Sequence, residues 1–470
     1  MKSTPVTLAE LEHLMVAVPG GPLLGTVKGN IPGDKSMSHR AALFAGLADG
    51  ESIIENFLVS GVTQAMLDAL TDLGVKWSLD ETTLHVWGKG VRGLQPPEAP
   101  INCGNSATTL RLLAGALAAA GVPAVLDGSA GLRSRPMKRI VEPLRKMNVP
   151  IEATGDGLAP LKLVERAEDE PLKPLNYTLP VASAQVKSCL MLAALAADGS
   201  TTLREPGPSR DHTERMLSSM GVEVHWEEKQ NAHQQVSTVT TLKAPNPLRL
   251  NPLQMSLPGD FSAAAFLIVA ALITPGSNVV LQQVGLNPTR TGLLEVLIQM
   301  GADIQVSNRS DQGGEPVGDL TIRCSKLKGF IFPPGSAANL VVRMIDEFPV
   351  YAVAAAFAEG VTEVRDAGEL RLKESDRISA LVQELLAIGV DIQETRDGFV
   401  IRGGGAVRGG SVQAHGDHRL AMALAVAGLA SQQAVTIHQA EVVSESFPGF
   451  IPTLRALGAN LSEAKIRRSV

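Results

Sequence analysis

The sequence predicts an α/β protein of two domains, built from six repeated units. Three observations predict this class. A closing pattern of the type Leu/Met-Gly-Val/Ala recurs along the chain, an Ala/Leu-rich segment precedes each closing, and one proline-rich stretch divides the repeats into two groups of three. The 470 residues, of which 44% are hydrophobic and 19% charged, have the composition of a well-packed protein with more than one domain.

Each repeat closes at the end of an amphipathic segment, and alternating residues that predict a strand follow. The spacing between closings exceeds the roughly 20–50 residues of solenoid repeats, so a stacked array is disfavoured. The closings begin at Leu73, Met147, Met220, Met300, Ile388 and Leu457.

Each repeat also opens with a polar residue and a helix that is hydrophobic on nearly every side, which is typical of a fully buried helix. We expect Asp, Asn or Ser at each N-cap. The second helix of a repeat is amphipathic, as residues 62–75 illustrate, and is expected to cover a surface. The openings start at Gly33, Gly104, Ala182, Gly259, Asp346 and Gly416.

The proline-rich segment from Ala244 to Gly259 falls between the third and fourth repeats and is the candidate linker. Two domains of three repeats would leave a cleft between them. Because buried helices that begin at the same end of each domain aim their N-termini together, this cleft would collect the positive ends of helix dipoles.

The first opening, "GDKSMSHRAAL", concentrates cations at a helix start. Lys35 is expected at the cap position, and Ser36 and Arg40, four residues apart, share a helix face. Cations at a helix N-terminus are unfavourable unless an anion binds there. The motif lacks the second glycine and the Gly-Lys-Ser/Thr of a phosphate loop, so alone it also fits a solvated helix end.

The fifth repeat adds "RLKESDR", in which Lys373 and Arg377 flank Glu374. An exposed salt-bridged turn, worth about 0–1 kcal/mol, is the alternative for this motif alone. Cations recur at the matching places of other repeats, and the planar fork of arginine suits phosphate and carboxylate. We expect a cleft for two polyanions, with carboxylates as proton carriers. The recurring cationic residues are Arg133, Arg135, Arg210, His212, His418 and Arg419, Asp417 precedes His418 in the same motif, and the expected proton carriers are Asp346 and Glu374.

Several function classes are disfavoured. A net charge of -6 argues against general nucleic-acid binding. No Ser-His-Asp arrangement, dinucleotide fingerprint or metal-ligand spacing is present, so no cofactor or metal is expected. Cys103, Cys189 and Cys324 are expected to be buried in a reducing compartment. The first residues do not read as a signal peptide, and the longest apolar run, Phe261 to Ile273, is too short to cross a bilayer. We expect a cytoplasmic protein with no membrane partner.

The motifs together resemble the 5-enolpyruvylshikimate-3-phosphate synthase family. The resemblance covers nearly the whole chain from about residue 31 and rests on "IPGDKSMSHR", "CGNSATTLRL", "SRPM", "ASAQVKS", "SRDHTERM", "MIDEFP", "LRLKESDR", "GDHRLAMA" and "SFPGF", in that order. It implies a two-domain inverted α/β barrel of six βαβαββ-like units. Residues 34–255 would form the shikimate-phosphate side, and residues 1–33 plus 256–470 the second domain.

The resemblance also implies an activity in aromatic amino-acid biosynthesis, the transfer of the enolpyruvyl group of phosphoenolpyruvate to the 5-hydroxyl of shikimate 3-phosphate by a monomer without cofactors. Asp346 would take the hydroxyl proton, Glu374 would protonate the methylene carbon, and Lys35 would contact both ligands. The implied shikimate 3-phosphate residues are Ser36, Arg40, Ser183, Gln185 and Arg210, with Lys373 near both ligands. The implied phosphoenolpyruvate residues are Ala107, Arg135, Arg377 and Arg419.

Three departures are typical of the branch of the family that tolerates glyphosate. Glu445 stands where the other branch has a lysine, Ala184 where it has a serine, and Arg210 takes the place of a tyrosine pattern. The fold and donor are shared with UDP-N-acetylglucosamine enolpyruvyl transferases, but residues 129–137 lack the reactive cysteine of that family. A non-catalytic anion-binding protein, or an interaction protein built from repeats, is disfavoured by carboxylates among the cations.

Overall fold

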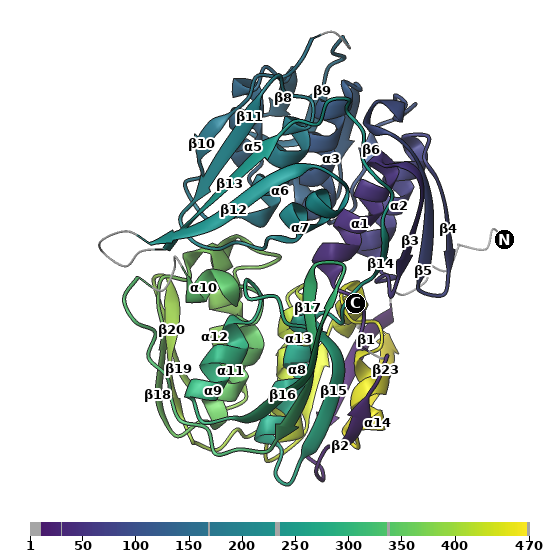
Figure 1. Cartoon of the computed structure of the whole chain (residues 1–470). Helices are drawn as coiled ribbons and strands as arrows, with labels where there is room; N and C mark the ends of the chain where they lie inside the picture. Colours follow the sequence, from purple (N-terminus) through teal and green to yellow (C-terminus); the bar gives the residue numbers. More distant parts are fainter. Residues whose placement is uncertain (1–10, 30, 168–169, 231–235, 336–338, 468–470) are drawn as a thin grey trace, which may run out of the picture.

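The computed structural model describes residues 11–29, 31–167, 170–230, 236–335 and 339–467 (Figure 1). The expectation about a signal peptide rested on residues 1–15, of which residues 1–10 lie outside the described part. The chain folds into two lobes, each with its own hydrophobic cluster. The upper lobe comprises the described residues 34–257, and its cluster runs from Met37 to Leu257. The lower lobe comprises the described residues 11–33 and 258–467, and its cluster runs from Met15 to Leu461.

The upper lobe contains three four-stranded sheets with one common pattern. In each sheet the first two strands are parallel and the remaining pairs are antiparallel. In spatial order the sheets are β14 (Gln254–Ser256), β3 (Asp49–Glu55), β5 (Thr83–Lys89) and β4 (Lys76–Asp80); β6 (Ile101–Asn102), β7 (Ala124–Asp127), β9 (Leu158–Leu163) and β8 (Ile151–Thr154); and β10 (Asn176–Thr178), β11 (Ser200–Glu205), β13 (Val236–Lys243) and β12 (Glu223–Gln230).

The lower lobe repeats this pattern with strands taken from both ends of the chain. Its sheets are β2 (Leu24–Val27), β15 (Asn278–Gly285), β17 (Glu315–Arg323) and β16 (Asp303–Gln312); β18 (Gly360–Val364), β20 (Gly398–Gly403) and β19 (Asp391–Thr395); and β21 (Gly410–Gln413), β22 (Val435–His438), β1 (Leu11–Val18) and β23 (Asn460–Arg467). In the three-stranded sheet, parallel bridges from Lys328 to Glu359, just before β18, and from Ile331 to Glu363 within β18 occupy the place of a first strand.

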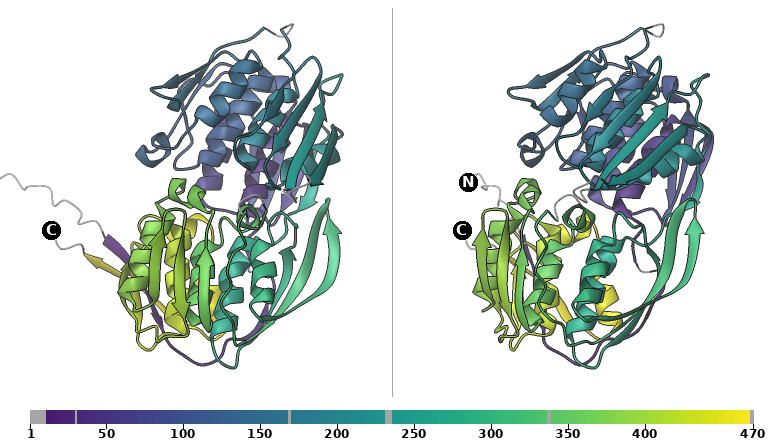
Figure 2. Two further views of the ribbon diagram at one scale, coloured as in Figure 1. Left: turned by 90° about the vertical axis from the view of Figure 1, so that its left-hand side faces the viewer. Right: turned by 60° about the vertical axis from the view of Figure 1, so that its left-hand side comes forward.

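The predicted two-domain α/β class and the six units are confirmed. The described strands are divided among these six small sheets, and none of the sheets closes on itself as a barrel. Two views in Figure 2 show the sheets on the outside of each lobe, with helices between them.

One buried helix from each unit forms the centre of its lobe, as expected from the all-round hydrophobic pattern. In the upper lobe α3 packs against α6 and α1, and in the lower lobe α11 packs against α13 and α8. Every residue of α8 is buried, because its sequence carries no charged side chain. These helices are α1 (Lys35–Leu47), α3 (Ala107–Ala120), α6 (Ala184–Ala194), α8 (Phe261–Ile273), α11 (Phe348–Phe357) and α13 (His418–Leu429).

Five of these helices begin after an Asp or Ser, as predicted. The fifth unit differs, because Glu347 rather than Asp346 is the N-cap residue of α11, and the carboxylate of Asp346 instead contacts arginines. Lys35 was expected at the cap of α1, but Asp34 holds that position and accepts a hydrogen bond from the Met37 amide at 2.9 Å. Lys35 is therefore the first residue of the helix.

The closing residues identified in the sequence are the C-caps of six outer helices, each followed directly by a strand. This confirms the second element of each unit. The helices are α2 (Gly61–Asp72), α5 (Lys138–Lys146), α7 (His212–Ser219), α9 (Gly292–Gln299), α12 (Arg377–Ala387) and α14 (Phe450–Ala456). Shorter helical turns are α4 (Ala130–Arg133), α10 (Leu340–Arg343), η1 (Val91–Gly93), η3 (Gly368–Leu372) and η4 (Ala440–Glu445).

The expected linker, Ala244 to Gly259, is largely packed rather than free. Leu250, Leu253 and Leu257 are buried in the upper cluster, and β14 within this segment pairs with β3. The leucines explain the difference, because burying them stabilises the segment against the sheet.

The chain crosses between the lobes at two segments, residues 32–34 and 258–260, which pair with each other. The Asp34 amide donates to the Pro258 carbonyl at 3.0 Å, and the Asp260 amide donates to the Pro32 carbonyl at 2.8 Å. A Cβ at Gly33 would lie 1.7 Å from the Asn56 carbonyl oxygen, so only glycine fits there. Helices α1 and α8 start at this crossing, which fixes their N-termini next to each other.

Two smaller expectations are settled by burial. Cys103 and Cys189 are buried, as predicted, and burial raises the pKa of each thiol to about 12. Cys324 is only partly buried, because it follows the last residue of β17. Among the described residues, no helix combines the length and apolar character needed to span a bilayer.

Candidate active site

A cavity of about 500 Å³ lies between the lobes and collects helix N-termini from both. The first residues of α1, α3, α6 and α13 line it. This agrees with the prediction that helix starts from both domains converge on the cleft. Of the catalytic and substrate residues that the resemblance implies, all except Arg377 line this cavity, whereas Arg133, His212 and Asp417 from the recurring motifs do not. Those that do are Lys35, Ser36, Arg40, Ala107, Arg135, Ser183, Gln185, Arg210, Asp346, Lys373, Glu374 and Arg419.

Asp346, just before α11, is surrounded by three arginines. Its Oδ1 lies 3.3 Å from Nη1 of Arg377, and its Oδ2 contacts Arg210 and lies 3.5 Å from Nη2 of Arg419. Burial opposes ionisation of this carboxyl, but the arginines prevail and hold its pKa well below the usual range. Asp346 is therefore ionised in the absence of substrate.

Glu374 lies between two arginines on the same side of the cavity. Its Oε2 accepts from Nη2 of Arg377 at 2.6 Å, and its Oε1 lies 3.6 Å from Nη1 of Arg135. Burial raises the pKa of Glu374, but the neighbouring cations outweigh it and hold the pKa well below the usual range. Without a substrate this carboxylate carries no proton.

Arg377 does not line the cavity but ties its carboxylates together. Its Nε donates to Oδ2 of Asp417 at 2.7 Å, while its two other nitrogens reach Asp346 and Glu374. Its side chain is 2% exposed. The three carboxylates fix the plane of this guanidinium and keep its charge at the cavity wall.

Lys35 projects into the cavity without a carboxylate ion pair among the described residues. Its Nζ lies 3.3 Å from Nε2 of His418. Burial and the nearby Arg419 lower the pKa of Lys35 to about 8, against the opposing effect of Glu374, Asp346 and Asp260. Lys35 is thus a cation whose pKa lies only slightly above neutral pH.

Arg40 is more buried than a ligand-binding arginine needs to be, with 1% exposure. Its Nε donates to Thr213 and its Nη2 to Ser188, both at 2.8 Å, and its Nη1 donates to the Ser36 carbonyl at 3.0 Å. Most of its donors are therefore used inside the protein. Its charge still faces the cavity, and it holds Ser36 in position.

Two arginines of the cavity were not singled out in the sequence. Arg111, one helical turn after Ala107, contacts the side-chain carbonyl of Gln185 and donates to the Pro136 carbonyl at 3.0 Å. Arg139 on α5 lies 3.3 Å from Glu369. A cation on the hydrophobic face of a core helix was the available signal for Arg111, whereas nothing in the sequence marks Arg139.

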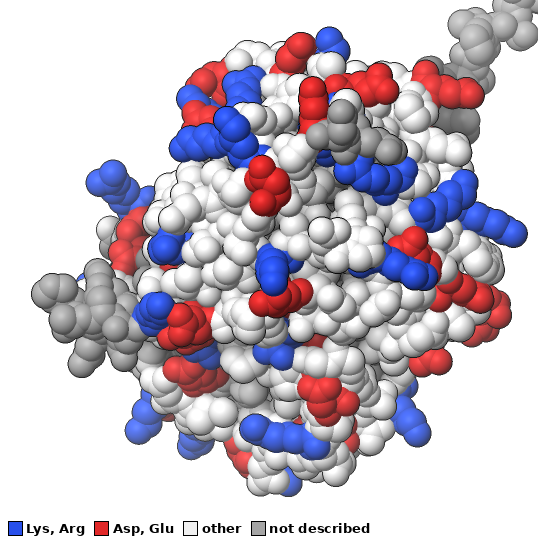
Figure 3. Space-filling model, turned by 45° about the horizontal axis from the view of Figure 1, so that its top comes forward, with Lys and Arg blue, Asp and Glu red and all other residues white. Residues whose placement is uncertain are grey.

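Ion pairs cross from lobe to lobe at the cavity. Arg135 and Arg139 of the upper lobe face Glu374 and Glu369 of the lower lobe, and Arg210 contacts Asp346. On the outer face seen in Figure 3, basic and acidic side chains are interspersed. The cations that could bind an anion at the cavity include Lys35, Arg135, Arg210 and Arg419, which line it.

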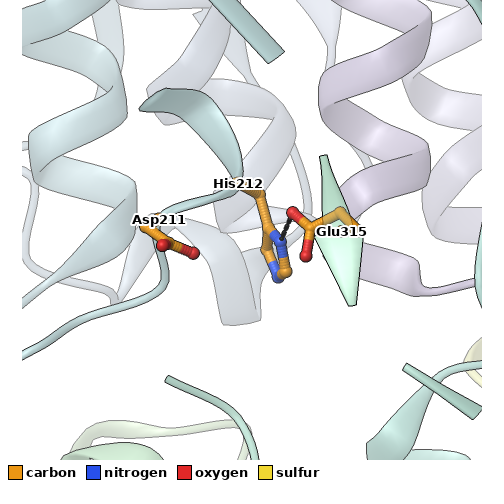
Figure 4. A group of neighbouring side chains, drawn as sticks. All are labelled: Asp211, His212 and Glu315. Carbon is orange, nitrogen blue, oxygen red and sulfur yellow. Dashed lines mark hydrogen bonds and ion pairs between the residues drawn. The ribbon is translucent and has the colours of Figure 1, made fainter. Parts of the chain in front are cut away.

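A second buried group, Asp211, His212 and Glu315, has the spacing of a possible metal site (Figure 4). His212 Nδ1 lies 2.7 Å from Glu315 Oε1, and Asn287 donates to Asp211 at 2.6 Å and to Glu315 at 2.9 Å. An amide donor between the two carboxylates occupies the place that a cation would take. We interpret this group as a hydrogen-bonded contact between the lobes.

Residues 18–454 match the model of the family described as EPSP synthase (3-phosphoshikimate 1-carboxyvinyltransferase). The 3-phosphoshikimate 1-carboxyvinyltransferase of Salinibacter ruber is 48% identical over 91% of this chain and 95% of that protein. The protein of the same name from Xanthomonas campestris pv. campestris strain B100 is 46% identical over 95% of this chain and 98% of that protein.

Solved structures give the same picture. An EPSP synthase from Acinetobacter baumannii superimposes with a TM-score of 0.82 at 40% identity, covering 96% of this chain and 100% of that chain. The enolpyruvyl transferase NikO from Streptomyces tendae, at 18% identity and a TM-score of 0.74, shares the fold. With a family model that spans most of the chain and relatives this similar, the chain belongs to the EPSP synthase family, the 3-phosphoshikimate 1-carboxyvinyltransferases.

Proposed function

We propose that the cavity between the lobes binds shikimate 3-phosphate and phosphoenolpyruvate together and transfers the enolpyruvyl group to the 5-hydroxyl of the shikimate ring. The observation that carries this proposal is the gathering of Lys35, Arg210, Arg135 and Arg419 around the two carboxylates Asp346 and Glu374 in one cavity. A site for anions alone gains nothing from carboxylates beside its ligand.

Shikimate 3-phosphate is assigned to the upper lobe. Ser36 Oγ lies 2.6 Å from Nη1 of Arg210, so a hydroxyl and a guanidinium face the same point at the start of α1. A phosphate there would also meet the amides at the starts of α1 and α6. The proposed ligands are Ser36, Arg40, Ser183, Gln185, Arg210 and Lys373.

Phosphoenolpyruvate is assigned to the side where Arg135 and Arg419 face Glu374 and Asp346. Its phosphate and carboxylate would compete with these protein carboxylates for the arginines. Lys35 would bridge the two substrates, and Ala107 would limit the space at the start of α3. Arg377 would hold the carboxylates of Asp346 and Glu374 in place from outside the cavity.

The proposed chemistry needs one proton acceptor and one proton donor. The ionised Asp346 accepts the proton of the 5-hydroxyl as the oxygen attacks C2 of phosphoenolpyruvate. Glu374 gives a proton to C3. Glu374 becomes protonated when the anionic groups of the substrate draw the arginines away from its carboxylate, because this raises the pKa of Glu374. The tetrahedral intermediate then returns a proton from C3 to the Glu374 carboxylate as the bond from C2 to the phosphate oxygen breaks and phosphate leaves.

The ion pairs across the cavity support this sequence of steps. Pairs such as Arg139 with Glu369 join the two lobes, and closure of the lobes around bound substrates would protect the intermediate from water. The arginines around the phosphate stabilise the charge that develops as it leaves. No step requires a metal or an organic cofactor.

We also propose how the chain is divided and where it works. The hydrophobic clusters support a first domain of residues 34–255 and a second of 1–33 plus 256–470, with the second crossing shifted to residues 258–260 because Leu257 packs in the upper cluster. We propose a monomer in the cytoplasm, without nucleic-acid or membrane partners. The net charge of -6 and the interspersed surface charges support the absence of nucleic acid (Figure 3).

The experiment is an assay of the purified chain with shikimate 3-phosphate and phosphoenolpyruvate, following phosphate release and identifying the product by mass spectrometry. The expected product is the enolpyruvyl ether. In a parallel reaction UDP-N-acetylglucosamine replaces shikimate 3-phosphate, and no phosphate release is expected. Turnover of the nucleotide sugar alone would overturn the proposal.

A further inference from the structure

Glu445 is the last residue of η4 and lines the cavity, at the position where the other branch of the family carries a lysine. Its side chain is 30% exposed. A carboxylate here reverses the charge at a place beside phosphoenolpyruvate. The carboxylate therefore needs a role other than binding an anion.

The contacts of Glu445 lead to Lys35 through one histidine. Oε2 of Glu445 lies 3.5 Å from Nδ1 of His418, and Nε2 of His418 lies 3.3 Å from Nζ of Lys35. Because an ammonium group only donates, Nε2 accepts and Nδ1 carries the proton. The imidazole is 2% exposed, and its Nδ1 has no hydrogen-bond partner among the described residues. The contact between Nδ1 and the Glu445 carboxylate, at 3.5 Å, is therefore electrostatic rather than a hydrogen bond, and the negative charge favours the tautomer with the proton on Nδ1.

We propose that Glu445 is a positioning residue that acts through His418 to hold the Lys35 ammonium in the cavity. The inference rests on the proposed function, in which Lys35 bridges the two substrates. Glu445 fixes the tautomer of His418 that can accept from Lys35, and its negative charge favours the protonated lysine. The negative charge at this position therefore stabilises the Lys35 cation through His418, where the other branch of the family places a cation directly.

Charged groups from several other elements also face Lys35 and His418. His418 and Arg419 face Lys35 from α13, Asp260 from the start of α8, and Glu374 and Asp346 from the segments before α12 and α11. His418 itself is faced by Lys35, Arg419, Arg377 and Glu374. Burial and the neighbouring cations lower the pKa of Lys35 to about 8 and hold the pKa of His418 well below its usual value. His418 therefore stays neutral, and removing one anion acts on the lysine.

The test uses Glu445→Gln, which keeps the size and removes the charge. The matched control is Glu441→Gln, the same change on the exposed side of η4. In the protein with 13C-labelled lysine side chains, the Lys35 signal is assigned by its loss in Lys35→Gln, and its titration midpoint is measured by NMR. Glu445→Gln should lower the midpoint by about 0.5 pH unit or more, and Glu441→Gln should leave it unchanged.

Kinetics separate this inference from the proposed function. The alkaline limb of kcat/KM for phosphoenolpyruvate should move to lower pH in Glu445→Gln by the same amount as the NMR midpoint. In a His418→Gln background the substitution at Glu445 should add less than twofold, because the two act in series. An unchanged NMR midpoint in Glu445→Gln would overturn the inference. A moved midpoint with an unchanged kinetic limb would instead remove Lys35 from the proposed mechanism.

Discussion

Nη2 of Arg377 donates to Oε2 of Glu374 at 2.6 Å, so the carboxylate proposed as proton donor is ion-paired before any substrate is bound. The same guanidinium also reaches Asp346 and Asp417. Acid and base are thus coupled through one buried cation. Binding of anionic substrate at these arginines weakens their hold on Glu374, which links substrate binding to the appearance of the proton that the reaction needs.

Glu374→Gln tests this assignment directly. The amide keeps the size of the side chain but carries no titratable proton, so kcat should fall about 10²- to 10⁴-fold while the affinities for both substrates stay within a few-fold. Phosphate release measures kcat, and calorimetry measures binding. Glu369→Gln, on the neighbouring η3 and also at the cavity, should lose far less activity. Near-normal turnover of Glu374→Gln would contradict the proton-donor role.

The methyl group of Ala107 in the cavity leads us to expect weak inhibition by glyphosate. It is the first residue of α3, is 4% exposed, and lines the cavity. Its methyl group would overlap an inhibitor longer than phosphoenolpyruvate, and overpacking by about one methyl costs on the order of 1–3 kcal/mol. Ala107→Gly should therefore bind glyphosate roughly ten- to hundredfold more tightly, with little change in KM for phosphoenolpyruvate. Inhibition assays competitive with phosphoenolpyruvate measure this, and equal sensitivity of the two proteins would refute the steric argument.

Lys187 predicts a large effect on stability. Its Nζ lies 2.8 Å from Glu205 and 2.7 Å from Glu214, and all three side chains are at most 1% exposed. Lys187→Met would leave two buried carboxylates without their cation and should lower the free energy of unfolding by about 3–5 kcal/mol. The control is Lys162→Met, which breaks an exposed pair with Glu152 and should cost about 0–1 kcal/mol. Urea unfolding measures both, and similar losses in the two variants would contradict the prediction.

His39 predicts a pH dependence of stability. Burial lowers its pKa to about 4 from a usual value of 6.5. As the pH falls below 6.5 the unfolded chain takes up this proton and the folded protein does not, so this group destabilises the fold progressively down to about pH 4. The full contribution is about 3 kcal/mol. Between pH 7 and 4, His39→Gln should show a shallower decline in unfolding free energy than the wild type. Parallel declines would show that His39 is not the group responsible.

The sequence was sufficient for the units because each unit encodes its own helices. The closing residues mark helix ends, and the cavity residues sit at helix starts, where local sequence determines structure. Asp346 was misjudged as a cap because its three arginine partners come from distant segments. The same reason hid Arg139, whose partner Glu369 lies on the other lobe, and the packing of Leu250 against the upper lobe. Contacts between residues far apart in sequence leave no periodic pattern to read.

The exchange of strands between chain segments has a consequence for folding during synthesis. All sheets of the upper lobe are complete once β14 has been made, so this lobe can form while the remainder is still being translated. The strands β1 and β2 are made first but pair with β22, β23 and β15. They must wait, unpaired, until those later strands leave the ribosome. β2 can pair once β15 has emerged, but β1 is among the last strands to pair, and the active cleft can close only after nearly the whole chain has emerged.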